Sequence, residues 1–415
     1  MTKNKLFHRD FTMVVIGQII SLFGNAVLRY ALPLYLLNQT HSAALFGAVS
    51  ACAFLPMIFF SPFGGIVADR VNKRSIMVIL DFFTAAIVLA YSLLRGALPL
   101  VPLLIAVLML LYGIQGAYQP AVSASLPVLA SPENLNAANA AINMVSSLSG
   151  LLGPALGGVI FAAFGLPPIL YISAFCFFCS AVMEIFIRIP FLRPQTSGGV
   201  WQTIQGDLRD SFRFITKQAP VLGKLGLIAA AINGVFSALI MVGMPVVITE
   251  SLGFSQAQGN RLYGFAQGAL ALGGLLGGLL VGVLGSRLKF SNSYRLLLPC
   301  TATLLPILLA VAFTGLPLLS YGILVLSCFV MMVLSSMFSI EVMAYAQTVT
   351  PQNLIGKVIA FISCLVLCAN PLGQLIYGVL FELLGRGVWP IFGGAFLLCL
   401  PLLFFSKKVI QQSAK

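Results

Sequence analysis

The sequence contains very little charge. Only 8% of its 415 residues are Asp, Glu, Lys or Arg, and the acidic residues number just 10. Hydrophobic residues make up 60% of the chain, and the mean hydropathy is +1.04. Soluble globular domains carry about 25% charged residues, so this composition excludes a water-soluble globular protein.

Histidine is equally scarce, and its scarcity argues against an enzyme. The 2 histidines, His8 and His41, both lie near the ends of apolar runs, and no paired intramembrane Asp or metal motif is present. All 8 cysteines fall within apolar runs. We interpret Cys176 and Cys179 as small packing residues rather than a redox or metal pair. We therefore expect no enzymatic activity, no cofactor and no metal.

The hydrophobic residues are gathered into long runs. A helix needs about 20 mostly apolar residues to cross a bilayer. The runs that qualify cover approximately 12–37, 43–67, 75–94, 98–128, 139–164, 168–189, 220–250, 261–285, 294–314, 317–347, 356–384 and 388–406. None shows the short alternating pattern of a barrel strand. The sequence predicts an all-α integral membrane protein with twelve transmembrane helices.

The layout of these runs is duplicated. The segment Gly65–Arg74 joins the second and third runs, and Gly282–Arg287 takes the same place about 220 residues later. Pro132-Glu133-Asn134-Leu135 and Pro351-Gln352-Asn353-Leu354 form a second matching pair. Two similar groups of membrane helices are typical of secondary transporters. We predict an N-terminal six-helix half over 1–189 and a C-terminal half over 220–415.

A polar segment over 190–219 separates the two halves. Apolar residues recur there at spacings of three and four, which predicts an amphipathic helix in the cytoplasmic interface. These residues are Trp201, Ile204, Leu208, Phe212 and Ile215. The segment serves as a connector, with regulation by a partner as the alternative.

The net charge of +13 follows from topology. Most Lys and Arg residues fall in loops that an even number of spans, with both termini inside, places in the cytoplasm. The basic balance therefore needs no nucleic-acid partner. We expect a monomeric multi-pass protein of the cell membrane, with both termini cytoplasmic, whose partners are the lipid bilayer, protons and a small-molecule substrate.

The loop after the second run carries a motif of glycine, acid and base. Gly65, Asp69, Arg70, Lys73 and Arg74 match, position by position, a pattern that resembles the loop signature of the major facilitator superfamily. The resemblance implies that Asp69 accepts hydrogen bonds from a helix terminus and pairs with an Arg, which latches the halves on the cytoplasmic side. The alternative for the three basic residues is topological charge alone. Ser286 replaces the acid in the second copy, so such a latch would be asymmetric.

The fifth span carries a second motif that resembles one found in transporters. Gly153, Pro154, Gly157 and Gly158 resemble the Gly-Pro-x-x-Gly-Gly element in the fifth helix of drug/proton antiporters, although the upstream glycines fit imperfectly. A proline-kinked packing helix is the alternative. We expect the smooth glycine faces of the fifth and eighth spans to pack together.

The chain is also similar to the macrolide-efflux and enterobactin-exporter-like branch of the superfamily. This resemblance rests on Gly17-Gln18-x-x-Ser21, Ala31-Leu32-Pro33-Leu34 and Gln119-Pro120. It implies export of bulky amphipathic compounds.

Ionisable residues inside the spans are functional candidates, because the bilayer makes them costly. Arg29 in the first span could bind an anionic substrate group or a titrating acid; otherwise it snorkels or pairs structurally. Glu341 is the first candidate for proton coupling, because protonation neutralises a buried carboxylate cheaply. Asp81 is the second, and a salt bridge within the loop motif is its alternative. Glu184 precedes Arg188 by four residues, which predicts a local ion pair.

Polar and aromatic residues at helical spacing mark two further faces. The fourth span offers Tyr112, Gln115, Tyr118 and Gln119, and the first offers Gln18, Ser21 and Asn25. Such faces suit an amphipathic ligand, although they could equally serve helix packing. The sequence predicts an exporter of amphipathic, drug-like molecules that works by alternating access and proton antiport. The alternatives are an exporter or flippase of anionic amphiphiles such as siderophores or lysophospholipids, and a transport-inactive sensor or scaffold.

Overall fold

The computed structural model describes residues 7–189, 206, 209, 212–284, 290–313, 315–351, 354–385 and 387–413. Side chains are described throughout these ranges except at positions 62–66, 68–70, 132, 136, 356, 412 and 413. All elements found in the described residues are helical. Contacts divide the chain into two compact units. The first comprises Met1–Gln39 and Cys52–Val200, and the second comprises Thr40–Ala51 and Trp201–Lys415.

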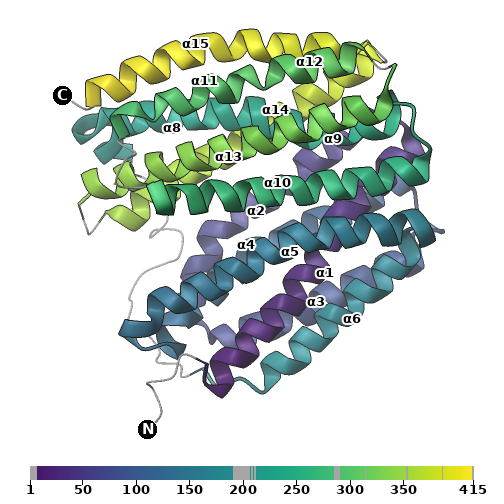
Figure 1. Cartoon of the computed structure of the whole chain (residues 1–415). Coiled ribbons are helices and arrows are strands. Elements are labelled where there is room, and N and C mark those ends of the chain that lie inside the picture. Colours follow the sequence, from purple (N-terminus) through teal and green to yellow (C-terminus); the bar gives the residue numbers. More distant parts are fainter. Residues whose placement is uncertain are drawn as a thin grey trace. The chain divides into compact units, whose positions relative to one another are not determined.

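The first unit is built from six long helices (Figure 1). They are α1 (Arg9–Thr40), α2 (Ala43–Arg70, shared with the second unit), α3 (Lys73–Leu94), α4 (Leu100–Leu129), α5 (Leu135–Phe164) and α6 (Leu166–Ile185), with the short η1 (Pro132–Asn134) before α5. Helix α3 packs along α6 and also against α4. One end of the unit has a core of side chains from α1, α3, α4 and α5, centred on Phe11, Met77 and Leu126.

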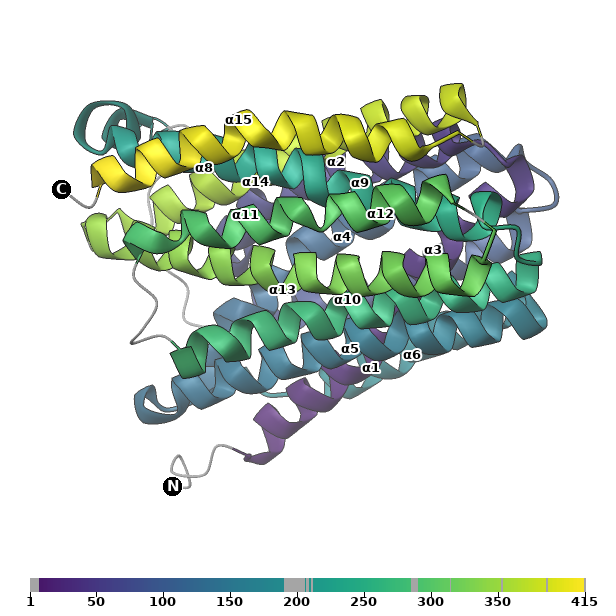
Figure 2. The same cartoon turned by 45° about the horizontal axis from the view of Figure 1, so that its top comes forward.

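The second unit contains the remaining spans, some of which comprise more than one helical element. The seventh span of the chain comprises four consecutive elements: α8 (Pro220–Ile232), η3 (Asn233–Ser237), α9 (Ala238–Val246) and η4 (Val247–Ser251). Both η elements are π-helical turns. Then follow α10 (Gln256–Leu284), η5 (Phe290–Asn292), α11 (Tyr294–Ala302), α12 (Leu304–Ala312), α13 (Pro317–Val349), α14 (Ile355–Leu384) and α15 (Trp389–Ser413). Helix α10 packs along α13, whereas α14 packs on α8 and α9 (Figure 2).

Twelve helical segments of the described chain are long and apolar enough to cross a membrane. The predicted all-α, twelve-span fold is therefore confirmed. The predicted ends differ by a few residues: the first span covers Arg9–Thr40 rather than 12–37. Hydropathy marks where apolar residues stop, whereas the helix continues until a cap or turn ends it.

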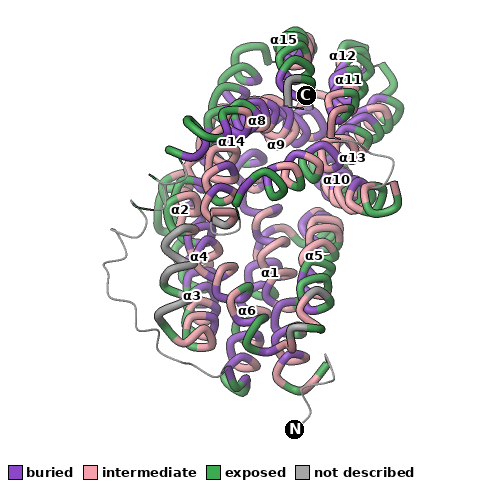
Figure 3. The backbone as a smooth tube through the Cα atoms, turned by 90° about the vertical axis from the view of Figure 1, so that its left-hand side faces the viewer, coloured by how far each residue is buried: buried purple, intermediate pink, exposed green. Residues whose placement is uncertain are grey.

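Large apolar side chains are exposed along the helices, as expected when lipid replaces water as the solvent. Phe175 is 68% exposed, and Leu279 and Val283 are 63% and 80% exposed. Exposed residues recur along the helices in Figure 3. Inside the bilayer the hydrophobic effect therefore does not drive helices together. Close packing and polar contacts between helices contribute more to their association.

Local chemistry sets several helix ends. The Asn72 side chain accepts a hydrogen bond from the Arg74 backbone N–H at 3.0 Å and so caps the start of α3. The Ser42 hydroxyl accepts one from the Leu45 N–H at 3.2 Å at the start of α2. Between α1 and α2, His41 has φ 50°, a left-handed conformation that is uncommon for a residue other than glycine. The chain thus turns sharply between two long helices.

Glycines allow close helix crossings in each unit. A Cβ on Gly153 would lie 2.4 Å from the Ala26 Cβ of α1, and one on Gly157 would lie 3.2 Å from Val27. In the second unit, a Cβ on Gly277 would lie 2.5 Å from the Val333 carbonyl oxygen of α13. The described contacts of both glycine faces thus lie within their own units, and mutual packing of the fifth and eighth spans stays a prediction.

The predicted connector helix lies mostly outside the described residues. Within it, Phe214–Gln218 forms one π-helical turn, η2, in which Phe214 and Ile215 are buried. They pack with Leu222, Ala346 and Val358 in a small core of the second unit. The C-terminal end of the segment is therefore held against the helices that follow it.

Candidate functional site

Arg29 meets two of the residues predicted on the fourth span. Its Nη1 donates a hydrogen bond to Gln115 Oε1 at 2.8 Å, and its Cζ lies 4.3 Å from the centroid of the Tyr112 ring. The Phe54 ring packs edge-on against Tyr112, with centroids 5.0 Å apart. Arg29 and Gln115 are partly buried, whereas Tyr112 is buried. The guanidinium is therefore held by an amide and an aromatic face, and its remaining N–H groups can still donate to a ligand.

Gln18 and Tyr118 lie in a different place from the Arg29 cluster. Gln18 Nε2 donates to the Tyr118 hydroxyl at 2.6 Å, and that hydroxyl donates to Glu184 Oε1 at 2.7 Å. All three residues are less than 5% exposed. Three of the four polar residues predicted on the fourth span therefore divide between two sites: Tyr112 and Gln115 lie with Arg29, and Tyr118 lies with Gln18. Asn25 and Gln119 are partly buried, and their side chains make no hydrogen bond within the described part of the chain.

Glu184 does not form the predicted ion pair with Arg188. Helix α6 ends at Ile185, and beyond it the Arg188 backbone N–H donates to Asp10 Oδ1 at 3.1 Å. The carboxylate of Glu184 points into the unit toward Tyr118 instead, and no basic side chain of the described residues lies within salt-bridge distance of it. The prediction was wrong because the helix ended before the fourth residue could complete the turn.

Asp81 lies near this network on α3. It is 2% exposed and accepts a hydrogen bond from the Ser21 hydroxyl at 3.0 Å. The alternative expectation, a salt bridge with the loop motif, is not met by the described side chains. Arg74 instead donates to the Ile185 backbone carbonyl at the end of α6.

The other predicted residues are less connected. Glu341 lies on α13 and is partly buried, and its carboxylate makes no hydrogen bond or ion pair within the described residues. Lys73 is partly buried at the start of α3. Gly65, Asp69 and Arg70 belong to the end of α2, but their side chains lie outside what the structure describes. The latch assigned to Asp69 therefore stays a prediction.

A cavity of about 340 Å³ lies within the second unit, between η3, α13 and α14. Its lining is mostly apolar, with Phe236 and Phe338 as the aromatic members. Small polar groups interrupt it: Asn233, Ser237, Ser335, Ser339 and Ser363. The Asn233 Oδ1 atom is buried and has no hydrogen-bond partner. These residues were not predicted, although Asn233 with Ser237 and Ser335 with Ser339 are polar pairs at i and i+4 within apolar runs.

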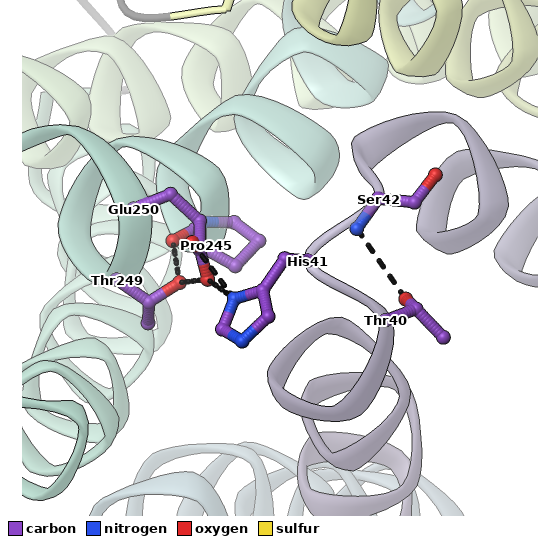
Figure 4. Close-up of polar contacts among 6 residues, drawn as sticks. All are labelled: Thr40, His41, Ser42, Pro245, Thr249 and Glu250. Atoms are coloured by element: carbon purple, nitrogen blue, oxygen red, sulfur yellow. Dashed lines mark hydrogen bonds and ion pairs between the residues drawn. The ribbon is translucent and has the colours of Figure 1, made fainter.

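Two carboxylates hold the turn before α2 in the second unit. His41 Nδ1 lies 3.1 Å from Glu250 Oε2, beside Thr249, whose hydroxyl donates to the Pro245 carbonyl at 2.9 Å (Figure 4). Glu382 Oε2 accepts from the Ser42 hydroxyl at 3.0 Å and from the Ala44 backbone N–H at 3.2 Å. A carboxylate at a helix N-terminus is favoured by the helix dipole.

Comparison with known proteins identifies the family. The family model of the Major Facilitator Superfamily matches residues 14–369. The chain belongs to this superfamily. The predicted family is thus confirmed, and the protein is a multi-pass membrane transporter by fold and family.

The superfamily relatives similar to this chain include drug efflux proteins. Macrolide efflux protein A of Streptococcus pyogenes is 24% identical over 97% of this chain and 96% of that protein. Multidrug efflux pump Tap of Mycolicibacterium fortuitum is 26% identical over 87% of each.

Among solved structures, the nucleoside transporter NupG matches with a TM-score of 0.73, 15% identity and coverage of 96% and 99%. A bacterial homologue of the lysosomal transporter Spinster, inward-facing and unoccupied, matches with a TM-score of 0.73, 14% identity and coverage of 97% and 96%. At such identities these matches support the fold alone.

Proposed function

We propose that this major facilitator transporter exports amphipathic small molecules from the cytoplasm by alternating access, in exchange for protons. The observation that carries the proposal is the cavity of the second unit. Its volume lies near the lower end of the range for small-molecule sites, about 300–1,000 Å³. Its walls combine aromatic rings with a few hydroxyl and amide groups, which is the chemistry that an amphipathic ligand requires.

The unpaired amide oxygen of Asn233 gives this cavity a directional element. A buried acceptor without a donor is unfavourable, by about 1–3 kcal/mol, and a ligand N–H or O–H would satisfy it. Four serine hydroxyls on the same lining can donate or accept. The full-length similarity to macrolide and multidrug efflux proteins supports the same class of substrate.

A second candidate function is the export of anionic amphiphiles, and Arg29 favours it. The guanidinium is only partly buried and is fixed by Gln115 and Tyr112. Such a group suits a carboxylate or phosphate headgroup and would repel a lipophilic cation.

Gradient-driven uptake into everted membrane vesicles tests both candidates. The panel contains a macrolide, a lipophilic cation, a catecholate siderophore and a lysophospholipid, and the variants are Asn233→Ala, Arg29→Ala and Glu341→Gln. Macrolide uptake that collapses with an uncoupler and weakens in Asn233→Ala supports the first candidate. Movement of the acidic ligands alone, lost in Arg29→Ala, supports the second. No movement of any ligand by the parent protein would contradict both and leave a sensor or scaffold.

A further inference from the structure

The core of the first unit contains a polar network with more acceptors than donors. Asp81 of α3 and Glu184 of α6 are 2% and 0% exposed, and each carboxylate has one hydrogen-bonded oxygen. The second oxygens, Asp81 Oδ2 and Glu184 Oε2, are buried without a partner. Burying an unpaired charged oxygen is costly, so something beyond the described hydrogen bonds must compensate these atoms.

An amide in the same network points to the same deficit. Gln18 is fully buried, its Nε2 donates to the Tyr118 hydroxyl, and its Oε1 has no partner. Tyr118 has only one hydroxyl proton, and it goes to Glu184. If the amide were turned round, Oε1 would need that proton, and Glu184 would have to supply a proton of its own to Tyr118. In either orientation the network has more acceptors than donors, and a hydrogen ion on a carboxyl supplies an additional donor.

The charged surroundings offer no alternative compensation. Ser21, which donates to Asp81, lies one helical turn from Gln18 on α1, and Gln18 is joined through Tyr118 to Glu184, so the two carboxyl groups belong to one cluster. Among the described residues, the other polar groups at the cluster are neutral hydroxyls, that of Ser21 on α1 and that of Ser180 on α6, which donates to the Gly17 carbonyl oxygen. Helix α5, which also packs on α6, carries no ionisable residue. The basic Arg74 is engaged by the carbonyl of Ile185, and the described residues contain no group of three His, Cys, Asp or Glu side chains that could hold a metal.

We propose that Asp81 and Glu184 form a buried carboxyl pair that binds the transported proton, with Tyr118 and Gln18 as positioning residues. This inference rests on the proposed function and assigns its coupling site to α3 and α6 rather than to Glu341. An O–H bond forms on Asp81 Oδ2 or Glu184 Oε2 when the proton arrives from outside. The bond breaks when the proton leaves to the cytoplasm, and the electron pair stays on the carboxylate oxygen. Two like charges in one buried site resist full ionisation, which is why the pair holds a proton.

The network is connected to the substrate-binding candidates through shared helices. Gln18 and Ser21 lie on α1, which also carries Arg29, and Tyr118 lies on α4, which also carries Gln115. Gln18 and Arg29 are eleven residues apart, about 16 Å along the helix. Gain or loss of the proton changes the attraction between α1, α4 and α6 where Gln18, Tyr118 and Glu184 meet. The Arg29–Gln115 contact joins α1 and α4 as well, so it experiences any shift between these two helices.

Two measurements on the full chain test this assignment. The first is infrared difference spectroscopy of the purified protein in nanodiscs between acid and alkaline pH, which detects the carbonyl band of a protonated carboxyl group. The parent should show the band, Asp81→Asn or Glu184→Gln should remove or shift it, and the exposed Glu133→Gln serves as the matched control. Tyr118→Phe keeps both carboxyls but removes the hydrogen bond to Glu184, so it should move the band without abolishing it.

The second measurement compares driven and undriven transport of a radiolabelled macrolide in proteoliposomes. One pH unit can support about tenfold accumulation per exchanged proton. The parent and Glu341→Gln should approach that ratio. Asp81→Asn and Glu184→Gln should stay near a ratio of one while retaining exchange of labelled for unlabelled substrate. Retained exchange also establishes that these variants are folded.

The outcomes separate this inference from the proposed function. A parent that moves no macrolide contradicts the function, whereas the infrared band still decides whether the pair binds a proton. A band and a driven ratio that survive in both carboxyl variants would overturn the pair as the proton site. Accumulation that follows a sodium gradient and is lost in the same variants would assign the pair to a cation instead, and would equally overturn the proposal.

Discussion

Gly373 on α14 offers a sharp test of how closely the cavity wall is packed. A Cβ at this position would lie 2.2 Å from the Gly234 carbonyl oxygen and 2.5 Å from the Ala238 Cβ. Ordinary contacts begin near 3.4 Å, so Gly373→Ala requires α14 to move by about 1 Å from η3 and α9. The obstructing atoms are backbone and a methyl group, neither of which can rotate away. We expect a destabilisation of about 1–3 kcal/mol, as for overpacked cores.

The same displacement should disturb ligand binding. Asn233 and Ser237 flank Gly234 on the π-helical turn η3, and both line the cavity opposite α14. Movement of α14 away from η3 therefore changes the cavity width. We expect weaker binding of a macrolide to Gly373→Ala, together with a lower melting temperature. For a unit of this size the melting temperature should fall by roughly 2–4 °C per kcal/mol.

Gly322→Ala on α13 is the matched control, because a Cβ there meets nothing within 4 Å. It should be neutral or slightly stabilising, since alanine favours a helix over glycine by about 1 kcal/mol. Melting in detergent micelles and equilibrium binding of labelled macrolide, measured on both variants, give the comparison. If Gly373→Ala melts and binds as Gly322→Ala does, the close crossing of α14 with η3 and α9 is refuted.

Three further changes have expected outcomes in the two units. Arg29→Lys keeps the charge but loses the planar group that stacks on Tyr112, so it should weaken binding of an acidic amphiphile by about 1 kcal/mol, measured by titration against the parent. An unchanged affinity would show that the stacking is unimportant. Ser42→Ala removes the cap of α2 and a partner of Glu382, which should cost about 1 kcal/mol in thermal unfolding. His41→Gly should be neutral or stabilising in the same assay, because glycine adopts the positive φ of this position without strain. The substitution loses only the contact with Glu250, which is weak because the His41 side chain is 64% exposed. A marked loss of stability would mean that the His41–Glu250 pair contributes more than its exposure suggests.

Periodicity predicted which residues share a helix face but not what those faces meet. Arg29, Gln115 and Tyr112 were each predicted as binding candidates, and the structure brings them together. Tyr118 was assigned to the same face, yet it points to Gln18 and Glu184 in the unit core. Residues three positions apart on a helix share a face but are offset by about 60° around the axis and by one turn along it, so each can contact a different neighbour. Only the placement of α1 and α6 around α4 decides which neighbour that is.

Local sequence rules also failed where a helix ended early and where contacts join residues that are distant in the chain. The spacing of Glu184 and Arg188 predicts a pair only if the helix continues, and α6 ends at Ile185. Glu250 and Glu382 carried no periodic signal, because their partners His41 and Ser42 lie about 200 and 340 residues away in the chain. Contacts between such distant positions depend on the tertiary fold.

The sequence by itself determined three properties of the protein. Its low charge indicated a membrane environment, the lengths of its apolar runs gave the number of spans, and the loop motif indicated the family. Tertiary structure alone decided that Asp81 and Glu184 are both buried within the first unit and that Asn233 lines a cavity. The physical reason is that lipid solvates every apolar helix face about equally well, so apolarity alone does not decide which faces pack together. Which polar groups become buried together depends on how the helices cross, and close approaches at Gly153, Gly277 and Gly373 set those crossings.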